Sequence, residues 1–206
     1  MTISATEAKD IFHAADLLYS REQVEAAMDR MAAEITQKLA DSDPIVLSVM
    51  NGGLVMGGQL LTRLNFPLRS DYVHATRYRN GTSGGSLHWL RPPEEQMDGK
   101  DVLIIDDILD EGVTLAAIVE GCRNQGATSV STAVLVEKVH DRTNGFKADF
   151  VGVQAEDRYL FGYGMDYFVV LKVNHKWPVF PAADGWLTYR AVFSRWCAPA
   201  GLDGCL

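Results

Sequence analysis

The sequence of 206 residues contains few cysteines, no long apolar run and no excess of basic side chains. Its three cysteines, Cys122, Cys197 and Cys205, are an odd number without C-x-x-C spacing, so they indicate neither a disulfide framework nor a zinc site. No apolar run approaches the ~20 residues that a membrane-spanning helix needs. The first ten residues lack the basic-then-apolar pattern of a signal peptide. We therefore expect a cytoplasmic protein without a membrane partner.

The charge balance is acidic, with 19 basic and 27 acidic side chains and a formal net charge of −8. Proteins that bind nucleic acids normally carry an excess of basic residues, so a nucleic-acid partner is not expected. Taken as a global quantity, the acidic balance is also unfavourable for a strongly anionic substrate. A hydrophobic content of 47% and a charged content of 22% are typical of ordinary globular proteins. The length suits a single domain with a substantial core.

Apolar residues recur with helical or strand spacing along most of the chain. A capping box of Ser20 and Gln23 predicts a helix that continues to about residue 39. Further helices are expected after residue 53 and over residues 114–125. Strands are predicted from apolar runs at residues 45–50, 68–78, 102–105, 130–136, 150–153 and 159–161. Strands that alternate with helices predict an α/β fold with an open, mainly parallel sheet flanked by helices.

The most informative segment runs from Val102 to Thr114. Four apolar residues predict a buried strand that ends at Asp106 and Asp107, and in open α/β sheets ligands bind at the carboxyl ends of strands. The following turn, from Asp110 to Thr114, enters a helix, and its backbone amides suit a phosphate. Carboxylates beside a phosphate site are expected to hold ribose hydroxyls, a magnesium ion, or both. The simpler alternative is that these aspartates only cap a helix.

This segment resembles the phosphoribosyl-pyrophosphate signature of type I phosphoribosyltransferases, and further segments resemble motifs of the hypoxanthine-guanine members. In order and spacing the resemblance covers residues 19–167. The Met50-Asn51-Gly52-Gly53 turn is similar to a pyrophosphate loop, and Tyr78 with the glycine-rich residues 79–86 is similar to a flexible lid. The two remaining segments are the strand end Val136-Glu137-Lys138 and residues 157–167, which resemble a base-binding segment.

The resemblance implies a purine salvage enzyme. Such an enzyme moves the phosphoribosyl group of 5-phosphoribosyl-1-pyrophosphate onto N9 of hypoxanthine or guanine, a 6-oxopurine base, and forms IMP or GMP plus pyrophosphate. One alternative is a relative that prefers xanthine. Another is a non-catalytic regulator that senses phosphoribosyl pyrophosphate. Regulators of that kind usually carry a DNA-binding domain or a basic surface, which the sequence does not show.

The resemblance also assigns roles to residues of the signature. Asp106 and Asp107 hold the ribose hydroxyls, directly or through Mg²⁺, and Asp110 is the catalytic acid/base for the purine proton. A raised pKa would make Asp110 a better base at neutral pH. The residues implied to cradle the 5′-phosphate are Asp110, Glu111, Gly112, Val113 and Thr114.

Four residues are implied to bind the purine. Lys138 donates to the purine O6, which would separate 6-oxopurines from adenine. Tyr159 stacks on the ring, and the backbone of Leu160 contacts its edge. Asp166 matches a further magnesium carboxylate close to the base. The bland alternatives are a solvated strand-end lysine for Lys138, a core aromatic for Tyr159 and an ordinary turn residue for Asp166.

The pyrophosphate loop is implied to be Asn51, Gly52 and Gly53, and the resemblance predicts a cis peptide bond between Met50 and Asn51. Tyr78 and the residues after it are expected to close over the site and exclude water. Lys172 stands where the family usually has an arginine, and a lysine cannot make the planar bidentate contact.

The resemblance implies one domain over residues 1–206 and a homodimer or homotetramer. Its core is expected at about residues 40–155, with a small hood formed by the N- and C-terminal segments at about 1–39 and 156–180. Residues 181–206 are a C-terminal extension of unknown role: a docking segment, a poorly ordered tail and an end altered by a frameshift all fit its composition. Because net charge is a global quantity and binding is local, the acidic balance is compatible with a polyanionic substrate that binds with Mg²⁺.

Overall fold

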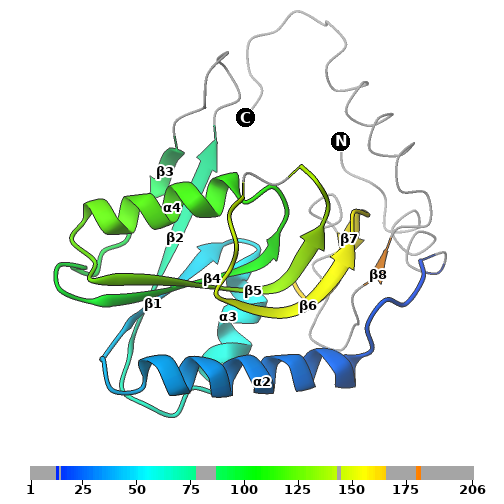
Figure 1. Ribbon diagram of the computed structural model, residues 1–206, viewed down its shortest axis with the longest axis horizontal. Coiled ribbons are helices and arrows are strands. Elements are labelled where there is room, and N and C mark those ends of the chain that lie inside the picture. Colours follow the sequence, from blue (N-terminus) through cyan, green and yellow to red (C-terminus); the bar gives the residue numbers. More distant parts are fainter. Residues whose placement is uncertain (1–12, 14, 78–86, 143–144, 166–179, 182–206) are drawn as a thin grey trace, which may run out of the picture.

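The computed structural model describes residues 13, 15–77, 87–142, 145–165 and 180–181, and its centre is a six-stranded sheet (Figure 1). The strand order is β3-β2-β1-β4-β5-β6, and only the β2–β3 pair is antiparallel. The six strands are β1 (Ile45–Met50), β2 (Arg69–Arg77), β3 (Leu87–Arg91), β4 (Asp101–Leu109), β5 (Ser129–Val139) and β6 (Phe150–Glu156). A second, two-stranded sheet pairs β7 (Leu160–Phe161) with β8 (Phe180–Pro181).

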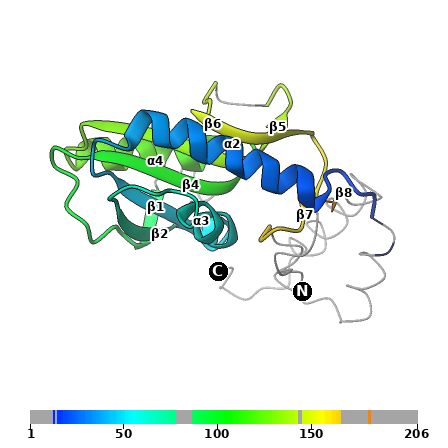
Figure 2. The same cartoon turned by 90° about the horizontal axis from the view of Figure 1, so that it is seen from below.

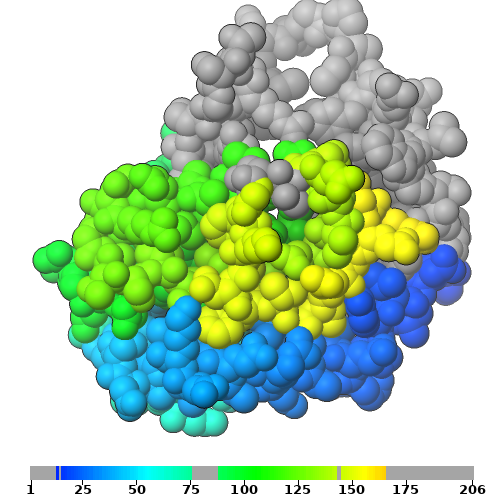
Figure 3. All heavy atoms as spheres, in the orientation of Figure 1, coloured from blue at the N-terminus to red at the C-terminus, as the bar shows by residue number. Residues whose placement is uncertain are grey.

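Helices cover both faces of the large sheet. Helices α2 (Arg21–Leu39) and α3 (Gly53–Leu61) pack on one face, and α4 (Val113–Asn124) packs on the other (Figures 1 and 2). In the space-filling view α2 forms a continuous layer along one side of the sheet (Figure 3). The structure thus confirms the predicted α/β fold with an open, mainly parallel sheet. No helix in the described part of the chain is long and apolar enough to cross a bilayer.

The central strand β4 supplies both hydrophobic cores. Leu103 and Ile105 belong to the core beneath α2 and α3, whereas Val102 and Ile104 belong to the core beneath α4. This alternation follows from the period of two in a strand, and it explains why the run is apolar without interruption.

The start of α2 confirms the predicted capping box. The Ser20 Oγ accepts a hydrogen bond from the Gln23 backbone N–H, and the Ser20 N–H donates to the Gln23 side chain at 2.8 Å. The buried side of α2 then carries Val24, Ala27, Met28, Met31, Ala32, Ile35 and Leu39. Although the predicted boundary at residue 39 places this helix in the hood, it lies along a face of the sheet.

Two strands extend further than predicted. Strand β4 does not end at Asp106 but runs on to Leu109, and β5 continues through Lys138 to Val139. The predictions placed both ends too early because they relied on the apolar runs alone. In the structure the two strands stay paired as far as Leu109 and Glu137, so their polar residues still form backbone hydrogen bonds within the sheet.

Strand β3 was not predicted, and it forms an antiparallel hairpin partner for β2. Its Trp89 packs on α4, since a Cβ added to Gly121 would lie 2.8 Å from the Trp89 ring. Three predicted features lie wholly or partly outside the described residues: the lid at Tyr78 and residues 79–86, the parts of the hood at residues 1–12, 14 and 166–179, and nearly all of the C-terminal extension.

The close approach of α3 to β4 yields a prediction. A Cβ added to Gly53 would lie 2.7 Å from the backbone oxygen of Ile105, whereas a Cβ added to Gly58, on the exposed side of α3, would meet no atom within 4 Å. We expect Gly53→Ala to lower the free energy of unfolding by about 1–3 kcal/mol. Gly58→Ala should raise it by about 0.5–1 kcal/mol. Denaturant unfolding of both variants measures the difference, and equal stability would contradict this packing.

Candidate active site

The predicted site residues that the structure describes gather at one edge of the large sheet. The parallel strands β1, β4, β5 and β6 all end at this edge (Figure 1). The loop of Asn51 and Gly52 follows β1, the turn from Asp110 to Gly112 follows β4, and Tyr159 comes shortly after β6. Segments that are far apart in the sequence therefore meet where ligands bind in open α/β folds.

The loop after β1 lies against the carboxylates of β4. The Met50–Asn51 peptide bond is cis, which confirms the prediction. A Cβ added to Gly52 would lie 2.5–2.6 Å from the carboxylate atoms of Asp107, so a larger residue at this position would displace that carboxylate. On the other side, a Cβ added to Gly164 would lie 2.8 Å from the Val55 Cβ and 3.5 Å from the Gly52 oxygen. The loop is thus held between β4 and the segment after β7.

Asp106 and Asp107 form a crowded acidic pair. Asp107 is buried, with 8% of the residue exposed. Its backbone N–H donates a hydrogen bond of 3.0 Å to Oδ1 of Asp106. Burial, together with the charge of Asp107, raises the pKa of Asp106 well above its usual range. Carboxylates in such a position are stabilised by hydroxyl donors or by a cation.

The start of α4 has the properties of an anion site. Its N-cap residue, Gly112, adopts φ 77°, a left-handed conformation that favours glycine, and no side chain caps the helix. The first turn contains no acidic residue, and Val113 and Thr114 remain partly exposed. Because the N–H groups and the dipole of a helix favour negative charge at its N-terminus, this turn suits a phosphate. Glu111, just before it, is exposed.

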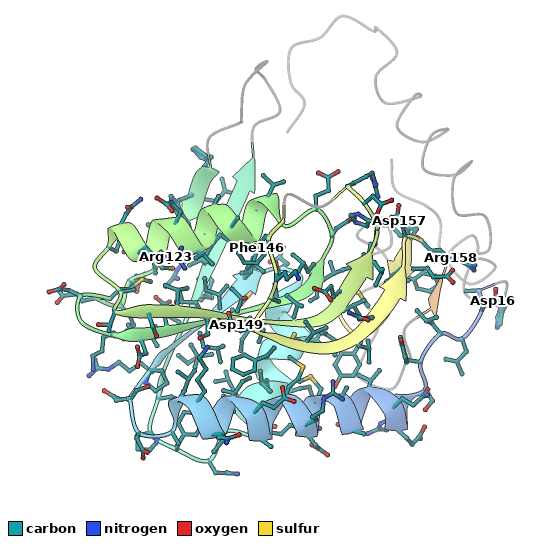
Figure 4. The ribbon with its side chains drawn as sticks, in the orientation of Figure 1. Asp16, Arg123, Phe146, Asp149, Asp157 and Arg158 are labelled. Atoms are coloured by element: carbon teal, nitrogen blue, oxygen red, sulfur yellow. The ribbon has the colours of Figure 1, made fainter. Side chains whose placement is uncertain are left out.

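Asp110 is held through both of its carboxylate oxygens. Lys138, whose side chain is 12% exposed, places Nζ 2.9 Å from Oδ2, and His140 places Nε2 2.7 Å from Oδ1. Asp157, which follows β6 at the same edge of the sheet (Figure 4), lies 3.8 Å from Lys138 and pairs with Arg142 at 2.7 and 2.8 Å.

These contacts lower the pKa of Asp110. Partial burial of the carboxyl acts to raise the pKa, but the hydrogen bonds and charges of Lys138 and His140 together outweigh this effect. Asp110 therefore lacks the raised pKa that would make it a better base at neutral pH. The physical reason is that Lys138, expected to face a purine, pairs with the neighbouring carboxylate.

The base segment is described only as far as Met165. Tyr159 is partly exposed, whereas the side chain of Leu160 is buried in the core with α2, so Leu160 can offer a ligand only its backbone. The predicted site residues Asp166, Lys172 and Tyr78 lie outside the described residues.

The sequence analysis missed His140, Arg142 and Asp157, which complete the network around Asp110. The spacing of Lys138 and His140 could have indicated that His140 belongs to the site, because residues two apart in an extended chain project to the same side. One ligand atom each from Asp110, His140 and Asp157 lie within 4.8 Å of one another. Lys138 and Arg142 already pair with both carboxylates, so the positive charge that a metal would supply is in place.

Comparison with known proteins places this arrangement in a family. Residues 15–167 match the family model for a phosphoribosyl transferase domain. The hypoxanthine-guanine phosphoribosyltransferase of Bacillus subtilis (strain 168) is 33% identical over 152 residues, which cover 73% of this chain and 84% of that protein.

Solved structures agree with this match. A hypoxanthine phosphoribosyltransferase from Trypanosoma cruzi, solved as a ternary substrates complex, is 25% identical with a TM-score of 0.73 and covers 81% of this chain and 94% of that one. The fold also matches a hypoxanthine phosphoribosyltransferase from Staphylococcus aureus, with a TM-score of 0.75, 23% identity and 87% and 96% coverage. Because the family model spans well over half of the sequence and every described residue of the site, this chain belongs to the type I phosphoribosyltransferase family.

Proposed function

We propose that the protein transfers the phosphoribosyl group of 5-phosphoribosyl-1-pyrophosphate to N9 of hypoxanthine or guanine and releases pyrophosphate. The observation that carries this proposal is the Asp110–Lys138 pair. Asp110 precedes the N-cap of α4 by two residues, and Lys138 lies 3.8 Å from Asp157 in the segment that carries Tyr159. The name and the 33% identity of the Bacillus subtilis relative support a 6-oxopurine as the acceptor. A Tritrichomonas foetus relative, 27% identical, is named a hypoxanthine-guanine-xanthine enzyme, so xanthine remains the second candidate.

The sugar phosphate is proposed to bind mainly through neutral groups. The turn from Asp110 to Thr114 offers backbone amides, and the loop of Asn51, Gly52 and Gly53 offers further amides to pyrophosphate. Neither adds formal positive charge. An acidic protein can bind a polyanion in this way because the field at the site depends on local dipoles rather than on the net charge of −8. Lys172 remains a candidate for pyrophosphate, and Tyr78 for the lid.

The acidic pair is proposed to hold the ribose hydroxyls and magnesium. Asp106 and Asp107 present hard oxygen donors, which magnesium prefers, and their crowding is relieved by a cation. When bound, magnesium neutralises charge on the leaving pyrophosphate. Asp166 is the candidate for a further carboxylate close to the base.

Asp110 and Lys138 are proposed to respond to the purine together. Lys138 lowers the pKa of Asp110 and keeps the carboxylate ionised at neutral pH. When Lys138 donates to the purine O6 instead, Asp110 loses this partner and becomes a stronger base as the purine arrives. The carboxylate can then accept the purine proton and also stabilise positive charge that develops on the ribose. Tyr159 stacks on the ring, and the Leu160 backbone contacts its edge.

Turnover of the purified protein tests the proposal. With phosphoribosyl pyrophosphate and magnesium we expect nucleotide formation from hypoxanthine or guanine and none from adenine, because Lys138 can donate to an oxo group but not to an exocyclic amine. Removal of magnesium with a chelator should abolish turnover, and its return should restore it. The change in purine absorbance follows the reaction. No turnover with hypoxanthine, guanine or xanthine would exclude this function.

Replacement of Asp110 tests its acid/base role. Asp110→Asn keeps the shape of the side chain but removes the base, so kcat should fall by roughly 10²–10⁴-fold, while KM for phosphoribosyl pyrophosphate changes little. Asp43 is a matched control because it also pairs with a lysine, Lys100, at 2.9 Å, and has a lowered pKa. Asp43→Asn should leave kcat unchanged. A fully active Asp110→Asn protein would rule out the acid/base role.

Replacement of Lys138 tests purine recognition. Lys138→Met removes the proposed donor to O6, and the loss of a charged hydrogen bond should lower kcat/KM for hypoxanthine by roughly 10- to 100-fold. Steady-state kinetics with hypoxanthine and adenine measure the effect, and the ratio between the two bases should fall as well. Lys100→Met, which breaks an equally short ion pair with Asp43, is the control. An unchanged ratio between the bases would show that Lys138 does not read O6.

A further inference from the structure

His140 is a buried histidine at the site for which the proposed function has no role. It follows the last residue of β5, and its side chain is 6% exposed. Its two ring nitrogens have different partners. Nε2 lies 2.7 Å from Oδ1 of Asp110, and Nδ1 accepts a hydrogen bond of 3.1 Å from the backbone N–H of Arg142.

These two contacts assign the tautomer of the ring. Because Nδ1 accepts from a backbone N–H, it carries no proton in this arrangement, and the proton lies on Nε2. Nε2–H therefore donates to Asp110. The backbone N–H of Arg142 holds the ring through Nδ1, so Nε2–H on the opposite side of the ring is directed at the Asp110 carboxylate.

The two oxygens of Asp110 thus have partners with different tasks. Oδ2 faces Lys138, which the proposed function moves to the purine O6, whereas Oδ1 faces His140, which has no such task. After Lys138 turns to the purine, Oδ2 is open to accept a proton while Oδ1 stays bound. Asp110 needs this support because it follows the end of β4, and its side chain is 42% exposed.

We propose that His140 is a positioning residue for phosphoribosyl transfer: its Nε2–H holds Oδ1 of Asp110 so that Oδ2 faces the purine. This inference rests on the proposed function, which supplies the roles of Asp110 and Lys138. Among the described residues, Lys138 and His140 are the side chains that donate hydrogen bonds to the Asp110 carboxylate. The charged and titratable groups around it are Lys138, His140, Arg142, Glu111 and Asp157.

Two variants of His140 separate positioning from packing. His140→Phe keeps a planar ring but removes the donor, and His140→Gln keeps an N–H near the position of Nε2. We expect kcat of His140→Phe to fall by about 10- to 100-fold at an unchanged KM for phosphoribosyl pyrophosphate. His140→Gln should recover most of this loss. Thermal unfolding of both variants accompanies the kinetics.

The pH profile gives a readout that packing alone would not move. His140 helps to lower the pKa of Asp110, so its loss should raise that pKa. Since Asp110 must be ionised to accept a proton, the acid limb of kcat/KM for hypoxanthine should move to higher pH in His140→Phe and return in His140→Gln. The profiles are measured with saturating phosphoribosyl pyrophosphate and magnesium, so that Asp106 and Asp107 are liganded throughout.

The outcomes distinguish this inference from the proposed function. Absence of turnover in the unmutated protein overturns both. An active protein in which His140→Phe has normal kcat and a normal acid limb overturns the positioning role alone, and so do equal losses in the Phe and Gln variants. If His140→Phe does not fold, ¹⁵N spectra of the histidine rings in the unmutated protein decide the point. The Nε2–H tautomer at His140 supports the inference, and the Nδ1–H tautomer overturns it.

Discussion

The parallel pairing of β4 with β1 and β5 is the constraint on which the site depends. Ile105 lies opposite Ser48 of β1 and Ala133 of β5, deep between the two cores. Parallel strands that are aligned in the interior reach the same edge together. The alignment of the strands is therefore sufficient to bring together the carboxylates of β4, the loop after β1 and the lysine of β5. Burial of apolar side chains thus sets the distances at which the polar groups interact.

Close packing at this edge limits which residues can form the site. The loop after β1 approaches the Asp107 carboxylate so closely that a Cβ at Gly52 would displace it, and a Cβ at Gly164 would lie 2.8 Å from the Val55 Cβ. These contacts place the loop, the acidic pair and the base segment against one another. A preformed arrangement of this kind costs little reorganisation when a substrate binds.

Two carboxylates four residues apart have opposite pKa shifts, and the difference follows from their surroundings. Asp106 is desolvated and lies beside the charge of the buried Asp107, so the charged form is disfavoured and the pKa rises. Asp110 is partly exposed and faces Lys138 and His140, so the charged form is favoured and the pKa falls. Opposite shifts suit opposite tasks: the acidic pair waits for a cation or for hydroxyl donors, whereas Asp110 stays ionised and ready to accept a proton.

Local patterns predicted the fold well because each depends on neighbours in the sequence. The capping box of Ser20, the apolar run of β4 and the glycine-marked turn at Gly112 are features of this kind. The ends of β4 and β5 were not predictable in this way, because they are set by pairing between residues such as Leu109 and Glu137. Strand β3 is stabilised in the same non-local manner, through β2 and α4.

The network around Asp110 shows the same limit in the site itself. Asp110 was singled out by its place in the phosphoribosyl-pyrophosphate signature, but the sign of its pKa shift depends on side chains 28 and 30 residues later in the chain. Lys138 and His140 reach it together because a strand projects every second residue to the same side. In the proposed function, Asp110 thereby has one partner, Lys138, that can leave it to bind a purine, and a second, His140, that remains bound. The spacing of two residues at the end of β5 and just beyond it is therefore a chemical feature of the site as well as a structural one.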